Sequence, residues 1–256
     1  MRGTSLRQYH IKLAQGDVGR YVFMPGDPGR VEKIAQYLDK ARFVGLNREY
    51  CTWTGELEGV EVSVTSSGIG GPSAAIAIEE LGAIGADTFI RLGTCGLLQP
   101  GLERGDLVIA SGAVRGGATA DAYVPPRFPA VADLEIQQAL CEAAREAGWR
   151  HRRGIVQCKD AFFLEEPERL PADAVAEGEW RVWERAGVLA SEMESDTLFV
   201  VGSVRGWRVG SILLGLGGRA SSSPIEPASA DELDRLVRCG VEGLRRLIRQ
   251  DLALGV

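Results

Sequence analysis

The chain has 256 residues, of which 45% are hydrophobic and 25% are charged. These values are typical of one globular domain, and a chain of this length can bury about three quarters of its unfolded surface. Lys and Arg number 29 and Asp and Glu number 35, so the net charge is −6. A mildly acidic chain without a basic stripe is a poor candidate for binding nucleic acid or an anionic membrane. We expect one domain over residues 1–256 that binds neither.

Cysteine usage indicates the compartment. The chain has five cysteines, an odd number, and none of them form a CxxC pair. This pattern is typical of reduced thiols in a cytoplasmic protein. No apolar run reaches 18 residues, so we expect no membrane span. The first residues lack a continuous apolar segment, so we do not expect secretion.

The first half of the chain alternates short apolar runs with helical patterns. Val60–Ser67 predicts a strand, and the helix after it opens on Pro72, a residue favoured in the first helical turn. Thr88–Leu92 is a second apolar run, and we expect the glycine-rich Gly93–Gly96 to form a turn at its end. Asp106–Ala110 is a third candidate strand.

The second half continues the alternation. A helix is predicted over Asp133–Ala147 with Asp133 as its N-cap, and strands over Gly154–Cys158 and Val209–Leu216. The final helix starts at Ser229, with Glu232 at capping-box spacing. Strands that alternate with helices predict an α/β fold around a parallel or mixed sheet.

Three glycine-bearing or turn segments carry arginines: Met24–Arg30, Asn47–Tyr50 and Arg91–Gly96. Glycines let backbone N–H groups approach an anion, and a guanidinium matches two oxygens of a phosphate at once. A small oxyanion held by the three arginines is one interpretation. The other is that each arginine is a solvated surface residue or a structural ion-pair partner.

Two glutamates flank a methionine in Glu192-Met193-Glu194, where an apolar strand gives way to a helix-like run. Ionised carboxylates accept two hydrogen bonds and therefore recognise vicinal sugar hydroxyls well. Acidic residues are also favoured in a first helical turn, where they complement the helix dipole. The residues alone leave both interpretations open.

Seven sequence blocks carry a resemblance to a known family: PGDPGRVEKIA, REYCTW, SSGIGGPSAAIAIEEL, RLGTCGLLQP, GDLVIASGAVR, FPAVADLE and SEMES. They occur in this order and span nearly the whole chain. Together they resemble the nucleoside phosphorylase family of the hexameric type, and most closely its uridine-cleaving members. The resemblance implies a three-layer α/β/α sandwich around a mixed, partly barrel-like sheet, and a hexamer built as a trimer of dimers.

The resemblance also implies an activity and its site. Phosphate would cleave a nucleoside, with uridine favoured, to free base and ribose 1-phosphate in nucleoside metabolism and pyrimidine salvage, with no cofactor required. The implied phosphate ligands are Gly26, Arg30, Arg91 and Thr94, with Arg48 reaching a neighbouring subunit. The implied ribose ligands are Glu192, Met193, Glu194 and, across the same interface, His10. Arg30, Arg91, Thr94 and Glu194 would carry catalysis. Glu49, Ile69 and Ser73 match a potassium site at the dimer interface.

The implied base-binding residues are Cys95, Gly96, Phe162, Glu166, Glu168, Arg169, Leu216 and Arg219. Uridine-cleaving members read uracil with a Gln and an Arg that follow the base-packing Phe162. Here Glu166 and Glu168 stand at those positions, and only a one-residue slip brings in Arg169. Two carboxylates would oppose the negative charge on a leaving uracil. Either Arg169 supplies the cation, or the natural base differs from uracil and offers a hydrogen-bond donor to the carboxylate, such as the N1–H of a 6-oxopurine.

Arg219 matches an arginine of the uridine-cleaving members, and the aspartate that purine-specific members carry nearby is missing. We therefore expect uridine, with a purine nucleoside as the alternative. Two further classes compete. A nucleosidase that uses water has no need for Arg30, Arg48 and Arg91 around an anion. A non-catalytic nucleoside-binding protein could dispense with the same arginines.

Overall fold

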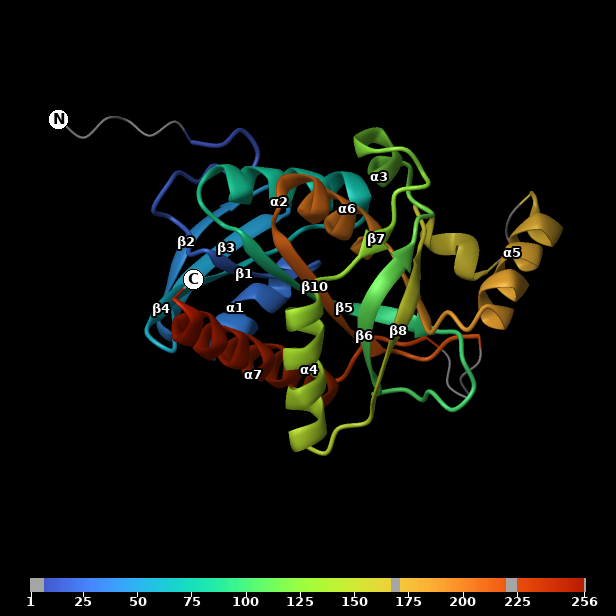
Figure 1. Ribbon diagram of the computed structural model, residues 1–256. Helices are drawn as coiled ribbons and strands as arrows, with labels where there is room; N and C mark the ends of the chain where they lie inside the picture. The colour runs from blue at the N-terminus through green and yellow to red at the C-terminus, as the bar shows by residue number, and fades with distance from the viewer. Residues whose placement is uncertain (1–6, 167–170, 220–224, 256) are drawn as a thin grey trace.

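A computed structural model of the chain describes residues 7–166, 171–219 and 225–255 (Figure 1). Its centre is a ten-stranded mixed sheet, as far as these residues define it. The strands are β1 (Tyr21–Pro25), β2 (Asp39–Asn47), β3 (Tyr50–Leu57), β4 (Val60–Thr65), β5 (Thr88–Leu97), β6 (Leu107–Val114), β7 (Ala130–Val131), β8 (His151–Cys158), β9 (Ala190–Glu192) and β10 (Arg208–Gly215).

Part of the sheet closes on itself. The strand order is β10-β6-β8-β9-β5-β1-β4-β3-β2, and an additional pairing of β10 with β5 completes a ring of five strands. Strands β1, β4, β3 and β2 extend in that order from β5 as an open sheet, and β7 pairs with β6. The predicted mixed, partly barrel-like sheet is therefore confirmed.

Strand β5 corrects one prediction. The glycine-rich Gly93–Gly96 was expected to form a turn, but it continues the strand to Leu97. Its second half pairs on both sides, because Cys95 lies opposite Gly215 of β10 and Leu97 opposite Ala190 of β9. Long-range pairing overrides the local preference of glycine for turns.

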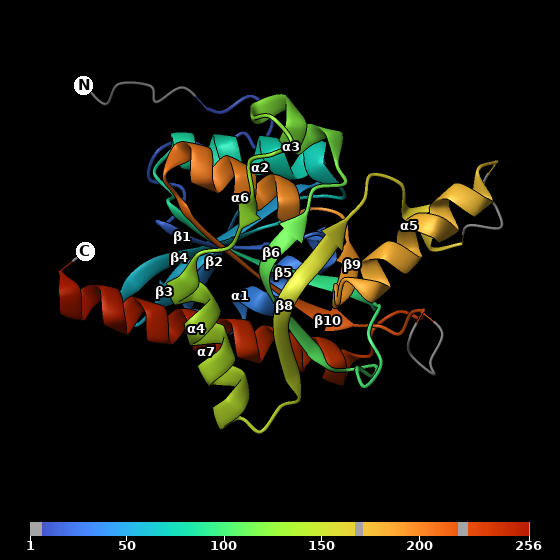
Figure 2. The ribbon, with the colours of Figure 1, turned by 45° about the vertical axis from the view of Figure 1, so that its right-hand side comes forward.

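Helices cover both faces of the sheet, which confirms the three-layer arrangement (Figures 1 and 2). One layer holds α2, α3 and α6, and the other holds α1, α4 and α7, while α5 projects to one side beside β8 and β9. The bounds are α1 (Val31–Ala35), α2 (Gly71–Ala83), α3 (Ala118–Tyr123), α4 (Leu134–Glu146), α5 (Asp173–Arg185), α6 (Ser195–Arg205) and α7 (Ala230–Leu254), with short 3₁₀ helices η1 (Pro28–Arg30) and η2 (Phe162–Glu165).

The two layers explain why β1 is apolar throughout. Val22 and Met24 belong to the core under α2 and α6, whereas Tyr21 and Phe23 belong to the core shared with α1, α4 and α7. Alternate residues of a strand point to opposite faces, so a strand covered on both sides needs apolar residues at every position.

Two predicted helix starts are confirmed. The Asp133 carboxylate accepts a hydrogen bond from Ile136 N at 2.9 Å. Ser229 and Glu232 form the reciprocal capping box at the start of α7. Among the described helices, none is long and apolar enough to span a bilayer.

The parallel strands place the site. β1 runs parallel to β4 and β5, and β5 runs parallel to β10. Their carboxyl ends therefore meet at one edge of the sheet, where open α/β sheets bind ligands. The segment Gly26–Arg30, the segment Gly68–Gly70 and Leu216 all follow these ends.

Candidate active site

A cavity of about 570 Å³ opens at this edge of the sheet. Most of the predicted site residues border it. Its lining includes Gly26, Arg30, Glu49, Ile69, Ser73, Arg91, Thr94, Cys95, Gly96, Phe162, Glu192, Met193, Glu194 and Leu216 from the predicted set. It also includes Asp27, Lys159, Glu165, Ser191 and Ile225, which the sequence analysis did not single out.

Arg91 projects from β5 into the buried end of the cavity. Gly93 makes room for it, because a Cβ atom at position 93 would stand 2.8 Å from Cζ of Arg91. That distance is far below ordinary van der Waals contact between carbon atoms. Gly93, two residues after Arg91 on the same strand, therefore leaves room for the guanidinium.

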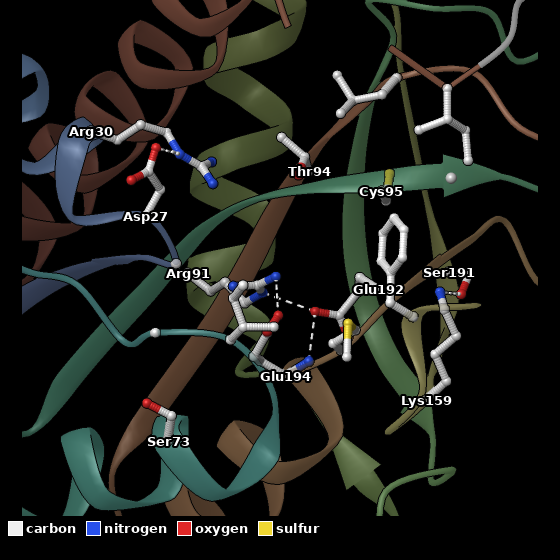
Figure 3. Close-up of a pocket in the computed structure, with 18 of the residues that line it drawn as sticks. Asp27, Arg30, Ser73, Arg91, Thr94, Cys95, Lys159, Ser191, Glu192 and Glu194 are labelled. Carbon is white, nitrogen blue, oxygen red and sulfur yellow. Dashed lines mark hydrogen bonds and ion pairs between the residues drawn. The ribbon is translucent and has the colours of Figure 1, made fainter. Parts of the chain in front are cut away.

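The Arg91 guanidinium binds both glutamates of the Glu192–Glu194 segment. Its Nε lies 2.9 Å from Oε2 of Glu192, and Nη2 forms an ion pair with Glu194. The side chains are only 5%, 0% and 6% exposed, in the order Arg91, Glu192, Glu194. Figure 3 shows this cluster between Arg30 on one side and Lys159 on the other.

Burial and charge act in opposite directions on this cluster. Burial favours the neutral form of Arg91, but the two carboxylates outweigh it and raise the pKa of Arg91. For Glu192, burial is outweighed by Arg91 and by hydrogen bonds, so its pKa is lowered. For Glu194, burial and the nearby Glu192 prevail and raise its pKa. One cation shared by two carboxylates leaves Glu194 as the less stabilised anion.

The Glu192–Glu194 segment both starts helix α6 and borders the cavity. Glu192 accepts hydrogen bonds from Glu194 N at 3.0 Å and Ser195 N at 2.9 Å, so it caps helix α6. Glu194 borders the cavity and also accepts a hydrogen bond from Gly70 N at 2.6 Å. The segment is thus at once a helix start and a wall of the site.

Arg30 lies at the same end of the cavity as Arg91 (Figure 3). Asp27 orders the turn before it by accepting a hydrogen bond from Gly29 N at 2.8 Å, and lies 3.8 Å from Arg30 Nε. Nη1 of Arg30 and Nη1 of Arg91 are buried and have no hydrogen-bond partner among the described residues. Burial, together with the like charge of Arg91, lowers the pKa of Arg30. An anion between the two guanidinium groups would satisfy both nitrogens and relieve that repulsion.

Lys159 and Glu165 occupy the opposite end of the cavity. Lys159 Nζ lies 2.6 Å from Glu165 Oε1 and 2.6 Å from Ser191 Oγ. Phe162 stands nearby on η2 and is 52% exposed. The sequence did not predict Lys159 and Glu165 as site residues because neither belongs to a local motif. The excess of carboxylates after Phe162 was the one sequence feature that pointed to this part of the site.

Two described residues of the predicted base-binding set, Arg219 and Glu166, do not line the cavity. Arg219 does not border the cavity, since its guanidinium pairs with Glu177 at 2.7 Å and Glu184 at 3.0 Å on α5. Glu166 follows η2 and is not part of the cavity wall that the described residues define. Glu168 and Arg169 lie outside the described residues.

His10 and Arg48 do not border the cavity of their own chain, as judged from the described residues. His10 Nδ1 lies 2.6 Å from Glu80 Oε1, so Nε2 is the ring nitrogen that does not contact this carboxylate. Arg48 is exposed at the β2–β3 turn and has a φ of 55°.

The predicted potassium ligands lie together at the cavity rim. Ser73 Oγ lies 2.9 Å from Glu49 Oε1. Ile69 is 78% exposed and also lines the cavity. Hydrogen bonding to the backbone lowers the pKa of Glu49 most, so this carboxylate is available as an anionic ligand.

The fold and the cavity agree with the comparison to known families. Residues 20–239 match the phosphorylase superfamily, and the chain belongs to that superfamily. The resemblance to nucleoside phosphorylases that the sequence blocks predicted is confirmed.

Individual relatives within this superfamily are named as phosphorylases of particular nucleosides. The chain is 46% identical over 246 residues to a uridine phosphorylase of Treponema pallidum, covering 95% of each chain. It is 47% identical over 220 residues to a uridine phosphorylase of Thermococcus kodakarensis, covering 84% of this chain and 79% of the relative. It is 36% identical over 241 residues to a guanosine phosphorylase of Halorubrum lacusprofundi, covering 94% of this chain and 96% of the relative.

Proposed function

We propose that this chain is a uridine phosphorylase, which cleaves uridine with inorganic phosphate to uracil and ribose 1-phosphate. The observation that carries the proposal is the pair of unpartnered guanidinium nitrogens on Arg30 and Arg91. Buried donors without acceptors are costly, so a site that keeps two of them is built for a ligand that supplies oxygens. Gly26 and Thr94 complete the phosphate pocket.

The ribose lies between the phosphate and the base. Glu194 and Met193 contact its 2′ and 3′ hydroxyls, with Glu192 behind them as the partner of Arg91. A carboxylate accepts several hydrogen bonds, so Glu194 can serve Gly70 N and a hydroxyl together. The base then lies beside Cys95, Gly96, Phe162 and Leu216.

The reaction needs no nucleophile from the protein. A phosphate oxygen forms the new bond to C1′ while the bond from C1′ to the base breaks, and its electron pair leaves with the base. Positive charge develops at C1′ and the ring oxygen, and the phosphate held by Arg30 and Arg91 complements it. Well-oriented attack of this kind can lower a barrier by roughly 7–11 kcal/mol.

A neighbouring subunit completes the site. Arg48 reaches the phosphate of the adjacent chain and His10 its ribose 5′-hydroxyl, in a hexamer built as a trimer of dimers. The support is that Arg48 is exposed and His10 partly exposed, and that neither borders the cavity of its own chain, as far as the structure describes it. The exposed Tyr9, 4.7 Å from His10 between ring centroids, supplies an apolar contact beside it.

Phosphate is the co-substrate, and the proposed reaction uses no organic cofactor. Glu49, Ser73 and the Ile69 carbonyl fit half of a potassium site, since hard cations prefer carboxylate, hydroxyl and carbonyl oxygens. A second copy would supply the other half at the dimer interface. Residues 1–256 work as one domain in the cytoplasm, which the five unpaired cysteines support.

Uridine is favoured over a purine nucleoside by the relatives named uridine phosphorylase. Another relative is named a guanosine phosphorylase, so a purine nucleoside is the alternative substrate. A panel of uridine, thymidine, cytidine, inosine and guanosine, with phosphate and with free base as the readout, separates the two. We expect uridine to show the highest kcat/KM, and preference for inosine or guanosine would contradict the proposal.

A further inference from the structure

The base end of the cavity holds a buried ion pair that the phosphate and ribose do not use. Lys159 directly follows β8, and its side chain is 3% exposed. Glu165 on η2 is 9% exposed and lies 2.6 Å from Lys159 Nζ. Both residues border the cavity. A Cβ atom at position 96 would stand 3.3 Å from Glu165 Oε1, so Gly96 leaves space for this carboxylate at the floor.

The hydrogen-bond pattern sets the direction of each contact around Lys159. Ser191 Oγ donates its single proton to Gln157 Oε1 at 2.7 Å, so it must accept from Lys159 Nζ. Glu165 accepts a second N–H. An ammonium group has three N–H donors, and the third has no acceptor in the described part of the chain.

The alternative cation at this end is already engaged. Arg219 pairs with Glu177 and Glu184, and its guanidinium lies 5.6 Å from the centroid of the Trp180 ring. Lys159 lies 5.7 Å from the same ring, but unlike Arg219 it borders the cavity. Among the described residues that line the cavity, the cations are therefore Arg30, Arg91 and Lys159.

The negative charge that develops on the leaving base during the reaction can be stabilised by the third cation, Lys159. Arg30 and Arg91 lie at the phosphate end, the two ribose-side glutamates in the middle and Lys159 at the far end (Figure 3). When the glycosidic bond breaks, its electron pair moves to N1 of the pyrimidine and spreads onto the carbonyl oxygens. A preorganised donor aimed at such an oxygen is worth most in a dry site.

We propose that Lys159 donates a hydrogen bond to a carbonyl oxygen of the leaving pyrimidine and stabilises its negative charge, with Glu165 and Ser191 holding the ammonium in place. This inference rests on the proposed function. No proton is transferred from Lys159, and the base anion takes its proton from water after cleavage. Lys159 thus supplies the positive charge that Glu166 at the expected uracil-reading position lacks, and it favours pyrimidines over bases without a carbonyl oxygen beside the glycosidic nitrogen.

The test compares two substrates whose bases differ in leaving ability. Fluorine withdraws electrons, so 5-fluorouracil needs less help to leave than uracil does. We expect Lys159→Met to lower kcat for uridine by about 100-fold and kcat for 5-fluorouridine by only about tenfold, in the range found for single oxyanion-stabilising donors. Lys40→Met, which removes an exposed lysine paired with Glu56, is the matched control and should leave both rates unchanged.

Two further measurements separate this role from a structural one. Phosphate should raise the melting temperature of Lys159→Met as much as that of the wild type, because the phosphate end is intact. Lys159→Gln, whose amide can still donate to Glu165, is the second variant if the methionine protein does not fold, and the same substrate dependence is expected. Equal losses on both substrates, or a loss below threefold, would overturn the inference while wild-type activity upholds the proposed function. A wild-type protein inactive on both nucleosides would contradict both.

Discussion

Nε of Arg91 lies 2.9 Å from Oε2 of Glu192, and neither side chain is more than 5% exposed. The pair joins β5 to the end of β9, just before α6, and it fixes the guanidinium so that Nη1 remains free of partners among the described residues. A buried cation held this rigidly is preorganised for an anionic substrate, because no side-chain reorganisation accompanies binding.

Replacing Arg91 tests the phosphate role. Arg91→Ala should raise the KM for phosphate and lower kcat/KM by about 100-fold or more, since a charge-assisted donor at the reacting anion is lost. It should also destabilise the fold by about 3–5 kcal/mol, because two buried carboxylates lose their cation. Arg205→Ala, at an exposed pair with Glu79, is the control. An unchanged phosphate KM and kcat would count against the assignment.

Gly93 offers a test that keeps every charge. Gly93→Ala would place a methyl group 2.8 Å from Cζ of Arg91 and 2.7 Å from Leu213 Cδ2, so the guanidinium must shift. We expect weaker phosphate binding, measured as a higher KM in steady-state kinetics. Gly178→Ala on α5, where nothing lies within 4 Å, is the matched control and should leave the KM unchanged. Equal behaviour of the two variants would contradict this role of Gly93.

The ribose role of Glu194 predicts a dependence on the 2′-hydroxyl. Glu194→Gln should reduce kcat/KM for uridine about tenfold more than for 2′-deoxyuridine, because only uridine loses the hydrogen bond from its 2′-hydroxyl to a charged acceptor. The readout is the ratio of the two kcat/KM values in variant and wild type. A ratio that does not change would remove Glu194 from the 2′-hydroxyl.

Asp196 on α6 gives a prediction about stability. Burial raises the pKa of Asp196 from 3.8 to about 6 despite the hydrogen bond from Gly117 N. The folded state therefore holds this proton more tightly than the unfolded state. The stabilisation is complete below pH 4 and is lost as the pH rises through about 6. A shift of about two pKa units corresponds to roughly 3 kcal/mol.

The matched variant is Asp196→Asn, which keeps an acceptor oxygen for Gly117 N and cannot ionise. The free energy of unfolding of Asp196→Asn minus that of the wild type should increase between pH 4 and pH 6.5. Denaturant titrations at four pH values measure it. A difference independent of pH would show that Asp196 ionises as it does in the unfolded chain.

Elements with local signals could be predicted from the sequence. The capping box of Ser229 and Glu232, and the N-cap at Asp133, depend on residues three apart, so the sequence carries the whole signal. The continuation of β5 through Gly93–Gly96 could not be predicted in this way. It depends on pairing with β9 and β10, whose residues lie about 95 and 120 positions further along the chain.

The site residues also differ in whether a local sequence pattern predicts them. Arg30, Arg91 and Glu194 stand in compact sequence blocks, and the structure brings them together. Lys159 and Glu165 form their ion pair only because η2 brings Glu165 next to the end of β8, and no sequence motif predicts this. Arg219 carried a family match, yet carboxylates on α5 engage it at a distance of about 40 residues in sequence.

The measurement that tests the central claim most directly is base release from uridine in buffer freed of phosphate, followed by addition of phosphate. If Arg30 and Arg91 hold the attacking anion, no uracil should form before the addition, and afterwards uracil and ribose 1-phosphate should appear in equal amounts. Release of uracil at the same rate without phosphate, with free ribose as the second product, would contradict the account.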